Sequence, residues 1–164
     1  MKCKSILDRQ VLSAADEFLT AAVSLLGQAR REVRIRSALL DGGVFDHYDF
    51  NQALSAFARQ AADNRIFILI DYPRALLQRD HRTVALMRRL SDKILFRHFY
   101  GEPDALRDSY LLVDQQGLLI QPADKDATGV YSLTDRIQTA DLLDKFNHEW
   151  QLSPQALQLR QLSI

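Results

Sequence analysis

Arg107–Ile120 reads RDSYLLVDQQGLLI, and this stretch decides the fold that we expect for the chain. Two apolar runs, SYLLVD and GLLIQP, stand on either side of Gln115-Gln116-Gly117. Apolar runs of this length, joined by a short turn that contains glycine, predict a β-hairpin. A polar residue precedes the first strand and Asp114 ends it. The hairpin therefore either carries a candidate catalytic site or keeps the structure of such a site without its chemistry.

Strand and helix patterns alternate upstream of the hairpin. REVRIRSALLD, residues 31–41, alternates apolar residues with arginines, as a strand does. RIFILID, residues 65–71, is a continuous apolar run, which is typical of a strand buried on both faces. Asp49, with Gln52 three positions on, predicts the start of a helix between them. The other predicted elements are a helix over residues 13–28, a helix from residue 72 to about residue 92, and a strand over KILFRHF, residues 93–99.

Downstream of the hairpin, Asp135 is predicted to cap a helix that runs to Trp150. The tail, LSPQALQLRQLSI, is a candidate for one further short helix. This order of helices and strands predicts an α/β fold with a mixed, mostly parallel sheet and helices on both faces. Because no linker, low-complexity stretch or internal repeat divides the sequence, we expect a single domain over residues 1–164.

Composition and charge narrow the class of protein. Hydrophobic residues make up 47% of the chain and charged residues 26%, which is the balance of a globular protein. No apolar run approaches the ~20 residues of a membrane helix, and MKCKSILDRQ does not resemble a secretory signal. Cys3 is the only cysteine, so we expect no internal disulfide and a reducing, cytoplasmic location.

The net charge is zero, but the two signs are unevenly spread. Residues 1–98 hold 16 Lys and Arg against 11 Asp and Glu, whereas residues 99–164 hold 5 against 10. Complementary halves could let two copies attract or could favour an anionic partner on one side. A fold that mixes both halves into one neutral surface explains the same counts.

The sequence resembles one repeat of the phospholipase D superfamily, from about residue 31 to residue 150. The stretches that carry the resemblance are REVRIRSALLD, DFNQALSAFARQAA, RIFILID, HRTVALMRRL, KILFRHF, SYLLVD, GLLIQP and FNHEW. In that family they correspond to a strand, a helix, a buried strand, a second helix, an edge strand, the catalytic strand, its hairpin partner and a last helix. The resemblance implies a phospholipase D-like single repeat, with residues 13–28 as an N-terminal helix and residues 151–164 as a tail.

The family's defining motif, H-x-K-x-x-x-x-D, is degenerate in this sequence. If its aspartate is aligned on Asp114, Arg107 takes the place of the histidine nucleophile and Ser109 takes the place of the lysine. Arginine is permanently protonated and has no lone pair for attack, and serine carries no positive charge for a developing oxyanion. The resemblance therefore implies the fold without the activity. Asp114 also has a structural explanation, since a strand-end aspartate commonly bonds the backbone of its own turn.

Asp46 and His47, with Asp49 close by, form a second group of candidate site residues. They follow the first predicted strand, where parallel sheets often build sites, and Asp71 ends the next strand. A polar loop that caps a helix explains the same residues. The histidines of the chain do not pair at a metal-ligand spacing, and no phosphate-binding glycine loop or G-x-S-x-G motif is present. We therefore expect no metal and no cofactor.

Basic residues concentrate between residues 79 and 97, and Arg82, Arg89 and Arg97 are candidate anion-binding residues. Arg82 and Arg89 are seven positions apart and share a helix face, but Asp80 and Asp92 partly neutralise this segment. The arginines from residue 79 to residue 89 have no phenylalanine, tyrosine or tryptophan interleaved with them for bases to stack on. A solvated helix face explains the same pattern.

The leading hypothesis is a non-catalytic phospholipase D-like domain that binds or regulates a partner, through protein contacts. The alternative is a nucleic-acid or phosphate-binding module that uses the degenerate cleft and the basic segment over residues 79–97. A third hypothesis is an enzyme whose chemistry has moved to Asp46, His47 and Asp71. Because the family brings two repeats together, the resemblance also implies a homodimer, and the sequence does not identify a protein partner.

Overall fold

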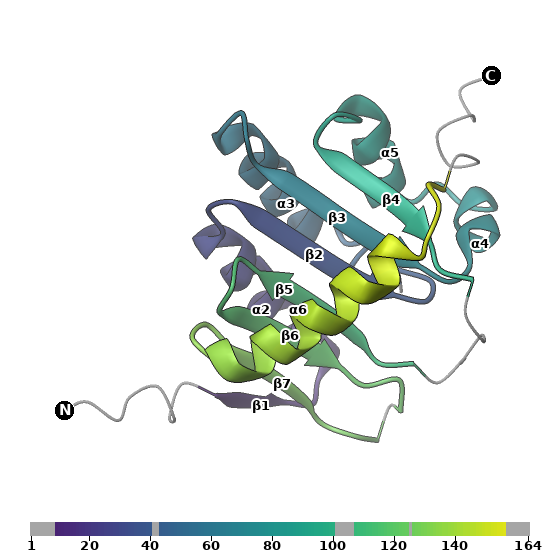
Figure 1. Cartoon of the computed structure of the whole chain (residues 1–164). Coiled ribbons are helices and arrows are strands. Elements are labelled where there is room, and N and C mark those ends of the chain that lie inside the picture. Colours follow the sequence, from purple (N-terminus) through teal and green to yellow (C-terminus); the bar gives the residue numbers. More distant parts are fainter. Residues whose placement is uncertain (1–8, 41–42, 101–106, 125, 157–164) are drawn as a thin grey trace.

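The computed structural model describes residues 9–40, 43–100, 107–124 and 126–156. The strands of these residues form one seven-stranded sheet in the order β1-β7-β6-β5-β2-β3-β4 (Figure 1). The predicted hairpin consists of β5 and β6, which pair from Ser109 with Gln121 to Val113 with Gly117. The strands are β1 (Gln10–Leu12), β2 (Glu32–Ser37), β3 (Arg65–Ile70), β4 (Ile94–His98), β5 (Ser109–Val113), β6 (Gly117–Gln121) and β7 (Gly129–Ser132).

The mixed α/β fold is confirmed, but the expected majority of parallel strands is wrong. Only β2 with β3 and β3 with β4 pair in parallel, whereas the other neighbouring strands pair antiparallel. The difference comes partly from β1 and β7, which the sequence did not predict because each is very short. Gly129 opens β7, and a Cβ atom there would lie only 2.3 Å from the ring of Phe18, so this strand depends on a close contact that periodicity does not reveal.

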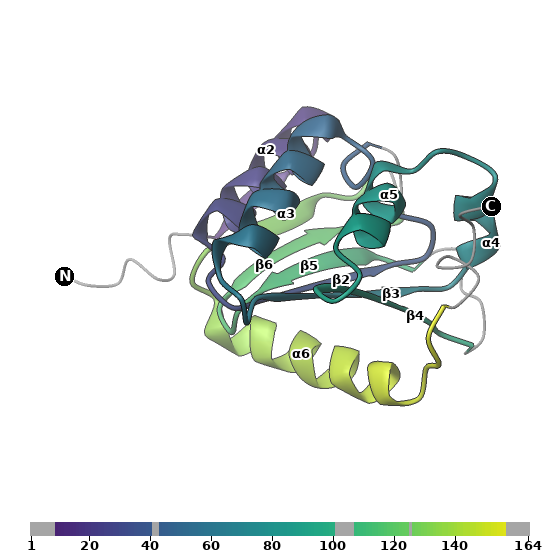
Figure 2. The same cartoon turned by 90° about the horizontal axis from the view of Figure 1, so that it is seen from above.

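Helices cover both faces of the sheet, as the sequence predicted (Figure 2). Figure 2 shows α2, α3 and α5 on one face and α6 alone on the other. The helices are α2 (Ala15–Gln28), α3 (Tyr48–Gln60), α4 (Pro73–Leu77), α5 (Arg82–Arg89) and α6 (Arg136–Gln151). Asp135 caps α6 as predicted, by accepting a hydrogen bond from the backbone N–H of Gln138 at 3.0 Å.

The single helix predicted over residues 72–92 is instead two helices, α4 and α5. His81 begins the second one, because its Nδ1 accepts a hydrogen bond from the backbone N–H of Thr83 at 3.1 Å. Its Nε2 lies 2.9 Å from the carbonyl oxygen of Leu40, which fixes the ring against the loop after β2. An acceptor role for Nδ1 and a donor role for Nε2 require the neutral imidazole.

Two apolar clusters hold the layers together. On the face covered by α2 and α3, Val33, Ile35, Ile66 and Ile68 of the central strands pack against Phe50 and other helix residues, and all of them are fully buried. On the opposite face, α6 contributes Phe146 to a smaller cluster with Leu69, Tyr110, Leu112 and Leu118.

The chain after α6 returns to the edge of the sheet. The backbone N–H of His98 donates to the carbonyl of Pro154 at 3.0 Å, and that of Ala156 donates to the carbonyl of Phe96 at 3.1 Å. Arg97 and Gln155 form an antiparallel bridge at the same place. Residues 154–156 therefore cover part of the outer edge of β4. The further helix predicted for the tail is not formed up to residue 156, and residues 157–164 lie outside the described part of the chain.

Burial of His81 makes stability depend on pH. The residue is 2% exposed, and burial lowers the pKa of its imidazole, although the Leu40 carbonyl and Asp46 act in the opposite direction. The folded-state pKa lies below the unfolded value of about 6.5, so the unfolded chain takes up the proton first as the pH falls. The contribution of His81 to stability is therefore fully present above the unfolded-state pKa. It is lost as the pH falls through the folded-state pKa.

We expect the free energy of unfolding to decrease between about pH 8 and about pH 5, when it is measured by urea denaturation. His98 acts in the same direction, because burial lowers its pKa as well. His81→Asn keeps a capping acceptor but no titratable ring, so its decrease should be smaller than that of the native protein. Equal slopes for the two proteins would contradict this role of His81.

Candidate functional site

An open cleft lies where the central strand β2 ends and its neighbour β5 begins. Its volume is ≈ 500 Å³, and it is lined by both motif positions, Arg107 and Ser109, together with Ser37. The other described lining residues are Ser13, Ala15, Phe18, Ala38, Leu39, Gly43, Gln121, Pro122, Ala123, Asp124 and Ala127. Two of the five candidates predicted at the degenerate cleft are thus brought together, while Asp46, His47 and Asp114 do not line it.

Arg107, which the motif alignment of the sequence analysis sets at the histidine position, is held by two carboxylates. Its Nε lies 3.3 Å from Oδ2 of Asp71, and its Nη1 lies 3.5 Å from Oε2 of Glu149. The Nε–H has no well-aligned hydrogen-bond partner among the described residues, so the contact with Asp71 is an ion pair. The guanidinium is fixed and remains protonated, so it can neither attack a substrate nor accept a proton.

Arg36 completes a buried charge cluster, which consists of Arg36, Asp71, Arg107 and Glu149. Its two Nη atoms contact the two carboxylate oxygens of Asp71 at 3.1 and 3.0 Å, and its Nε donates to Glu149 Oε1 at 3.1 Å. The Arg36 side chain is fully buried, and the two carboxylates are 4% and 10% exposed. Two guanidinium groups face two carboxylates, so the formal charges of the cluster cancel.

Aromatic side chains pack beside the charge cluster. The guanidinium carbons of Arg36 and Arg107 lie 5.2 and 5.5 Å from the centre of the Phe99 ring. The hydroxyl of Tyr110 is buried and has no hydrogen-bond partner in the described residues. Burial raises the pKa of Tyr110 well above its usual range, and Glu149 adds to this effect against the two arginines. The phenol therefore stays neutral beside the cluster.

His98, at the end of β4, lies close to Asp71 of the charge cluster. Burial lowers the pKa of its imidazole, although the backbone and the carboxylate of Asp71 favour the protonated form. Its Nδ1 is buried without a hydrogen-bond partner among the described residues, and its ring lies 3.8 Å from the ring of Tyr100. His98 is not among the described residues that line the cleft.

Ser109, which the same alignment sets at the lysine position, has a hydroxyl as its side-chain partner among the described residues. Its Oγ lies 3.2 Å from Oγ of Ser37, and Ser37 in turn accepts a hydrogen bond from the backbone N–H of Leu40 at 3.0 Å. No histidine lines the described part of the cleft. A serine hydroxyl without an adjacent base is a weak nucleophile.

Asp114 lies at the opposite end of β5 and has a structural role. Its carboxylate accepts hydrogen bonds from the backbone N–H groups of Arg30, Arg31 and Glu32 at 3.0, 2.9 and 3.1 Å. Its backbone N–H donates to the carbonyl of Glu32 at 2.8 Å, and its φ of 53° is in the left-handed region. The expected role in its own turn is wrong in detail, because Asp114 instead secures the segment that leads into β2.

Comparison with protein families identifies the chain. The sequence pattern described as Domain of unknown function (DUF7931) matches residues 14–162, which is most of the protein. The chain belongs to the DUF7931 family. No curated protein matches the sequence.

Solved structures show which fold the DUF7931 chain has. It matches Nuc, a phospholipase D family member from Salmonella typhimurium, at a TM-score of 0.63 and 17% identity, over 90% of this chain and 96% of that one. It matches NucT from Helicobacter pylori at 0.64 and 12% identity, over 90% and 98%. It also matches TrmBL2, described as an archaeal chromatin protein with a novel mode of DNA binding, at 0.66 and 15% identity. This last match covers 91% of the present chain and 53%, about half, of TrmBL2. The phospholipase D-like fold implied by the sequence is confirmed.

Asp46 and His47 of the DUF7931 chain are helix caps. His47, rather than the predicted Asp49, caps α3, because its Nδ1 accepts a hydrogen bond from the backbone N–H of Asp49 at 3.1 Å. Asp46 is distant from α5 in the sequence but helps to cap it, since its Oδ1 accepts a hydrogen bond from the backbone N–H of Arg82 at 2.8 Å. Neither residue pairs with Asp71, whose carboxylate forms ion pairs within the charge cluster.

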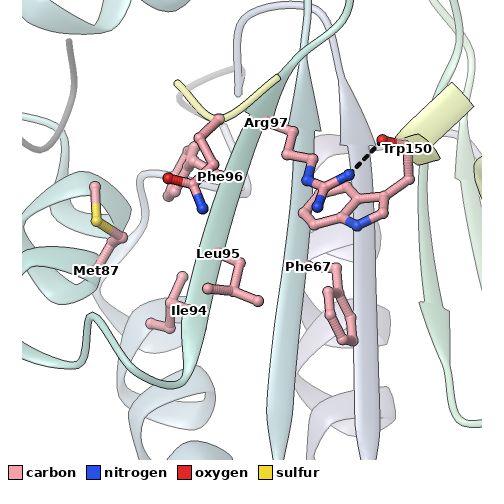
Figure 3. Close-up of a pocket in the computed structure, with 8 residues that line it drawn as sticks. Phe67, Met87, Ile94, Leu95, Phe96, Arg97 and Trp150 are labelled. Atoms are coloured by element: carbon pink, nitrogen blue, oxygen red, sulfur yellow. Dashed lines mark hydrogen bonds between the residues drawn. The ribbon is translucent and has the colours of Figure 1, made fainter. Parts of the chain in front are cut away.

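The three candidate anion-binding arginines do not gather. Arg82 and Arg89 line a groove between α3 and α5. Arg97 of β4 instead faces α6, where Nη1 donates to the carbonyl of Trp150 at 2.7 Å and the guanidinium lies over the Trp150 ring at 4.5 Å (Figure 3). The basic segment is therefore divided between the two faces of the sheet.

The part of the chain that the structure describes offers neither a metal-binding group of side chains nor a helix that could cross a membrane. No group of three or more His, Cys, Asp or Glu side chains there is arranged to hold a metal ion. No described helix combines the length and the apolar character needed to cross a bilayer.

Proposed function

We propose that this protein is a non-catalytic phospholipase D-like domain that acts by binding a partner. The observation that carries the proposal is the fixed guanidinium of Arg107 at the place of the nucleophile, paired with Asp71 and Glu149. A permanently charged arginine held by two carboxylates cannot form a covalent intermediate. The uncharged Ser109 at the lysine place supports the same proposal, because nothing there would stabilise a transferring phosphoryl group.

The charge cluster bears on what the cleft can bind. Arg107 is the cationic side chain among the described lining residues, and its charge is already neutralised by two carboxylates. An anion entering the cleft would have to compete with these ion pairs, so a phosphate ligand of the cleft itself is disfavoured. TrmBL2 has a similar fold and is described as a chromatin protein that binds DNA, which keeps nucleic acid as the second candidate partner, but at another surface.

The hypothesis of an enzyme with relocated chemistry receives no support from the geometry. Asp46 and His47 cap two different helices, and Asp71 is neutralised by Arg36 and Arg107. A general base must reach the proton that it removes, and these three side chains do not share one space.

A phosphodiesterase assay tests the proposal. The purified protein, incubated with bis(p-nitrophenyl) phosphate and with a labelled oligonucleotide, should release no product above the buffer rate. Ser37→Ala with Ser109→Ala serves as the matched control for background hydrolysis, because it removes the hydrogen-bonded pair of hydroxyls beside Arg107 without touching the charge cluster. Turnover that disappears in this double variant would reject the non-catalytic proposal.

The homodimer implied by the family resemblance stays part of this proposal. Leu39 is 43% exposed and lines the cleft, so an apolar side chain is present at the face where two repeats would meet. Sedimentation of the same sample at tens of micromolar tests it, and a single species near 18.8 kDa would reject pairing.

A further inference from the structure

Arginines that belong to two separate helices come together in the groove between α3 and α5. Arg59 comes from α3, and Arg82, Arg88 and Arg89 come from α5. No acidic side chain is among the described residues that line it. In a chain of zero net charge, four arginines along one groove form a local surface for an anionic partner.

The direction of the helices makes this surface elongated. The strands β2, β3 and β4 are parallel, so α3 and α5, which connect them, run side by side in the same direction (Figure 2). Arg82 and Tyr48 stand at the start of the two helices, while Arg59 and Arg89 stand at their ends. Arg82 and Arg89 are seven positions apart and therefore ~10 Å apart along the helix axis, so the charges suit an extended polyanion better than a single phosphate.

Tyr48 adds an aromatic face to the same groove. It is 57% exposed, and its hydroxyl accepts a hydrogen bond from the side-chain amide of Gln52 one turn further along α3. This bond anchors one end of the ring and leaves much of it open to solvent. Exposed aromatic rings beside arginines are the elements on which single-stranded nucleic acids stack and track.

A carboxylate lies close to the groove at the end where α5 begins. Asp46 lies 3.8 Å from the Arg82 guanidinium, whose Nη1 also donates to the Asp46 carbonyl at 2.9 Å, yet the Arg82 side chain remains 56% exposed. Asp49 is exposed beside Tyr48 but does not line the groove. The positive surface therefore remains strongest toward Arg59 and Arg89.

We infer that the α3–α5 groove binds single-stranded nucleic acid, with phosphates on its arginines and a base on Tyr48. This inference rests on the proposed function, because it names the partner of a domain that binds without catalysis. The combination of a basic groove with an exposed ring favours nucleic acid over an acidic peptide or inorganic polyphosphate, which have no bases to stack.

Fluorescence anisotropy with a labelled oligothymidylate of about 12 nucleotides tests the inference. If three arginines contact phosphates, raising the salt from about 50 mM to about 200 mM should weaken binding about twentyfold. Arg59→Gln with Arg89→Gln should weaken binding and reduce the salt effect to about threefold. Tyr48→Leu should weaken binding about tenfold, whereas Tyr48→Phe, which keeps the ring, should bind as the native protein does.

Arg74→Gln with Arg136→Gln is the matched control, because it removes the same charge from exposed positions outside the groove and should leave binding unchanged. Absence of binding at low salt, equal loss in the control, or equal competition by polyglutamate or by inorganic polyphosphate would overturn the inference. A denaturing gel of the same oligonucleotide separates the two proposals. Cleaved product rejects the non-catalytic function, whereas intact but unbound oligonucleotide rejects only the groove.

Discussion

Replacing Arg36 with leucine is expected to lower the free energy of unfolding by about 3–5 kcal/mol. The substitution removes the fully buried guanidinium that contacts both Asp71 and Glu149, and it leaves only Arg107 to balance two carboxylates. An uncompensated buried charge costs far more than the loss of one exposed ion pair. Urea denaturation of the purified variant measures the difference.

Arg34→Leu provides the matched control for Arg36. It lies two residues earlier on the same strand and the same face, but its ion-pair partner Glu32 has a side chain that is 45% exposed. Its replacement should cost about 1 kcal/mol or less. Equal losses of stability in the two variants would contradict a special contribution of the buried ion pairs of Arg36.

Replacing Phe146 with alanine is expected to cost about 3–5 kcal/mol. Phe146 is 1% exposed, and it packs against the sheet with Trp150, whose ring is stacked on it at 5.6 Å. Because α6 alone covers this face of the sheet, the cavity left by the ring has few neighbours that could fill it (Figure 2). Thermal and urea unfolding should agree on the loss.

Ile137→Ala is the control on the same helix. Ile137 is 82% exposed, so the truncation should change stability by less than about 0.5 kcal/mol. A Phe146→Ala effect as small as that of Ile137→Ala would place α6 on the outside of the molecule and contradict the packing described here.

Apolar periodicity predicted most of the elements because burial determines it directly. The continuous run RIFILID is β3, and the hairpin around Gln115-Gln116-Gly117 is β5 and β6. Two features escaped because they depend on partners distant in sequence. The break between α4 and α5 relies on the contact of His81 with Leu40, and β7 relies on the fit of Phe18 against Gly129.

The candidate site was predicted less completely than the fold. Arg107 and Ser109 do line the cleft. The motif alignment could predict this because it places them at the start of the first hairpin strand. Arg36 was missed because an arginine that alternates with apolar residues resembles the solvent face of a strand. The apolar residues of the helix that ends at Trp150 could have corrected this, because that helix needs a sheet face to cover, and Arg36 lies on it next to Glu149.

The basic groove was missed for a related reason. Within residues 79–97 no aromatic residue accompanies the arginines on α5, so the sequence argued against stacking. Tyr48 and Arg59 join them only because parallel strands bring α3 beside α5. A binding surface assembled from two helices cannot be read from either helix alone.

The short return of residues 154–156 along β4 also bears on how the protein behaves in a crowded solution. An outermost strand with unpaired N–H and C=O groups is a template on which strands of other molecules can add and aggregate. Here two of those groups are already bonded, to Pro154 and Ala156, and a proline supplies no N–H that could extend the ladder outward. The chain thus caps its own sheet, which protects this side of the molecule against uncontrolled self-assembly.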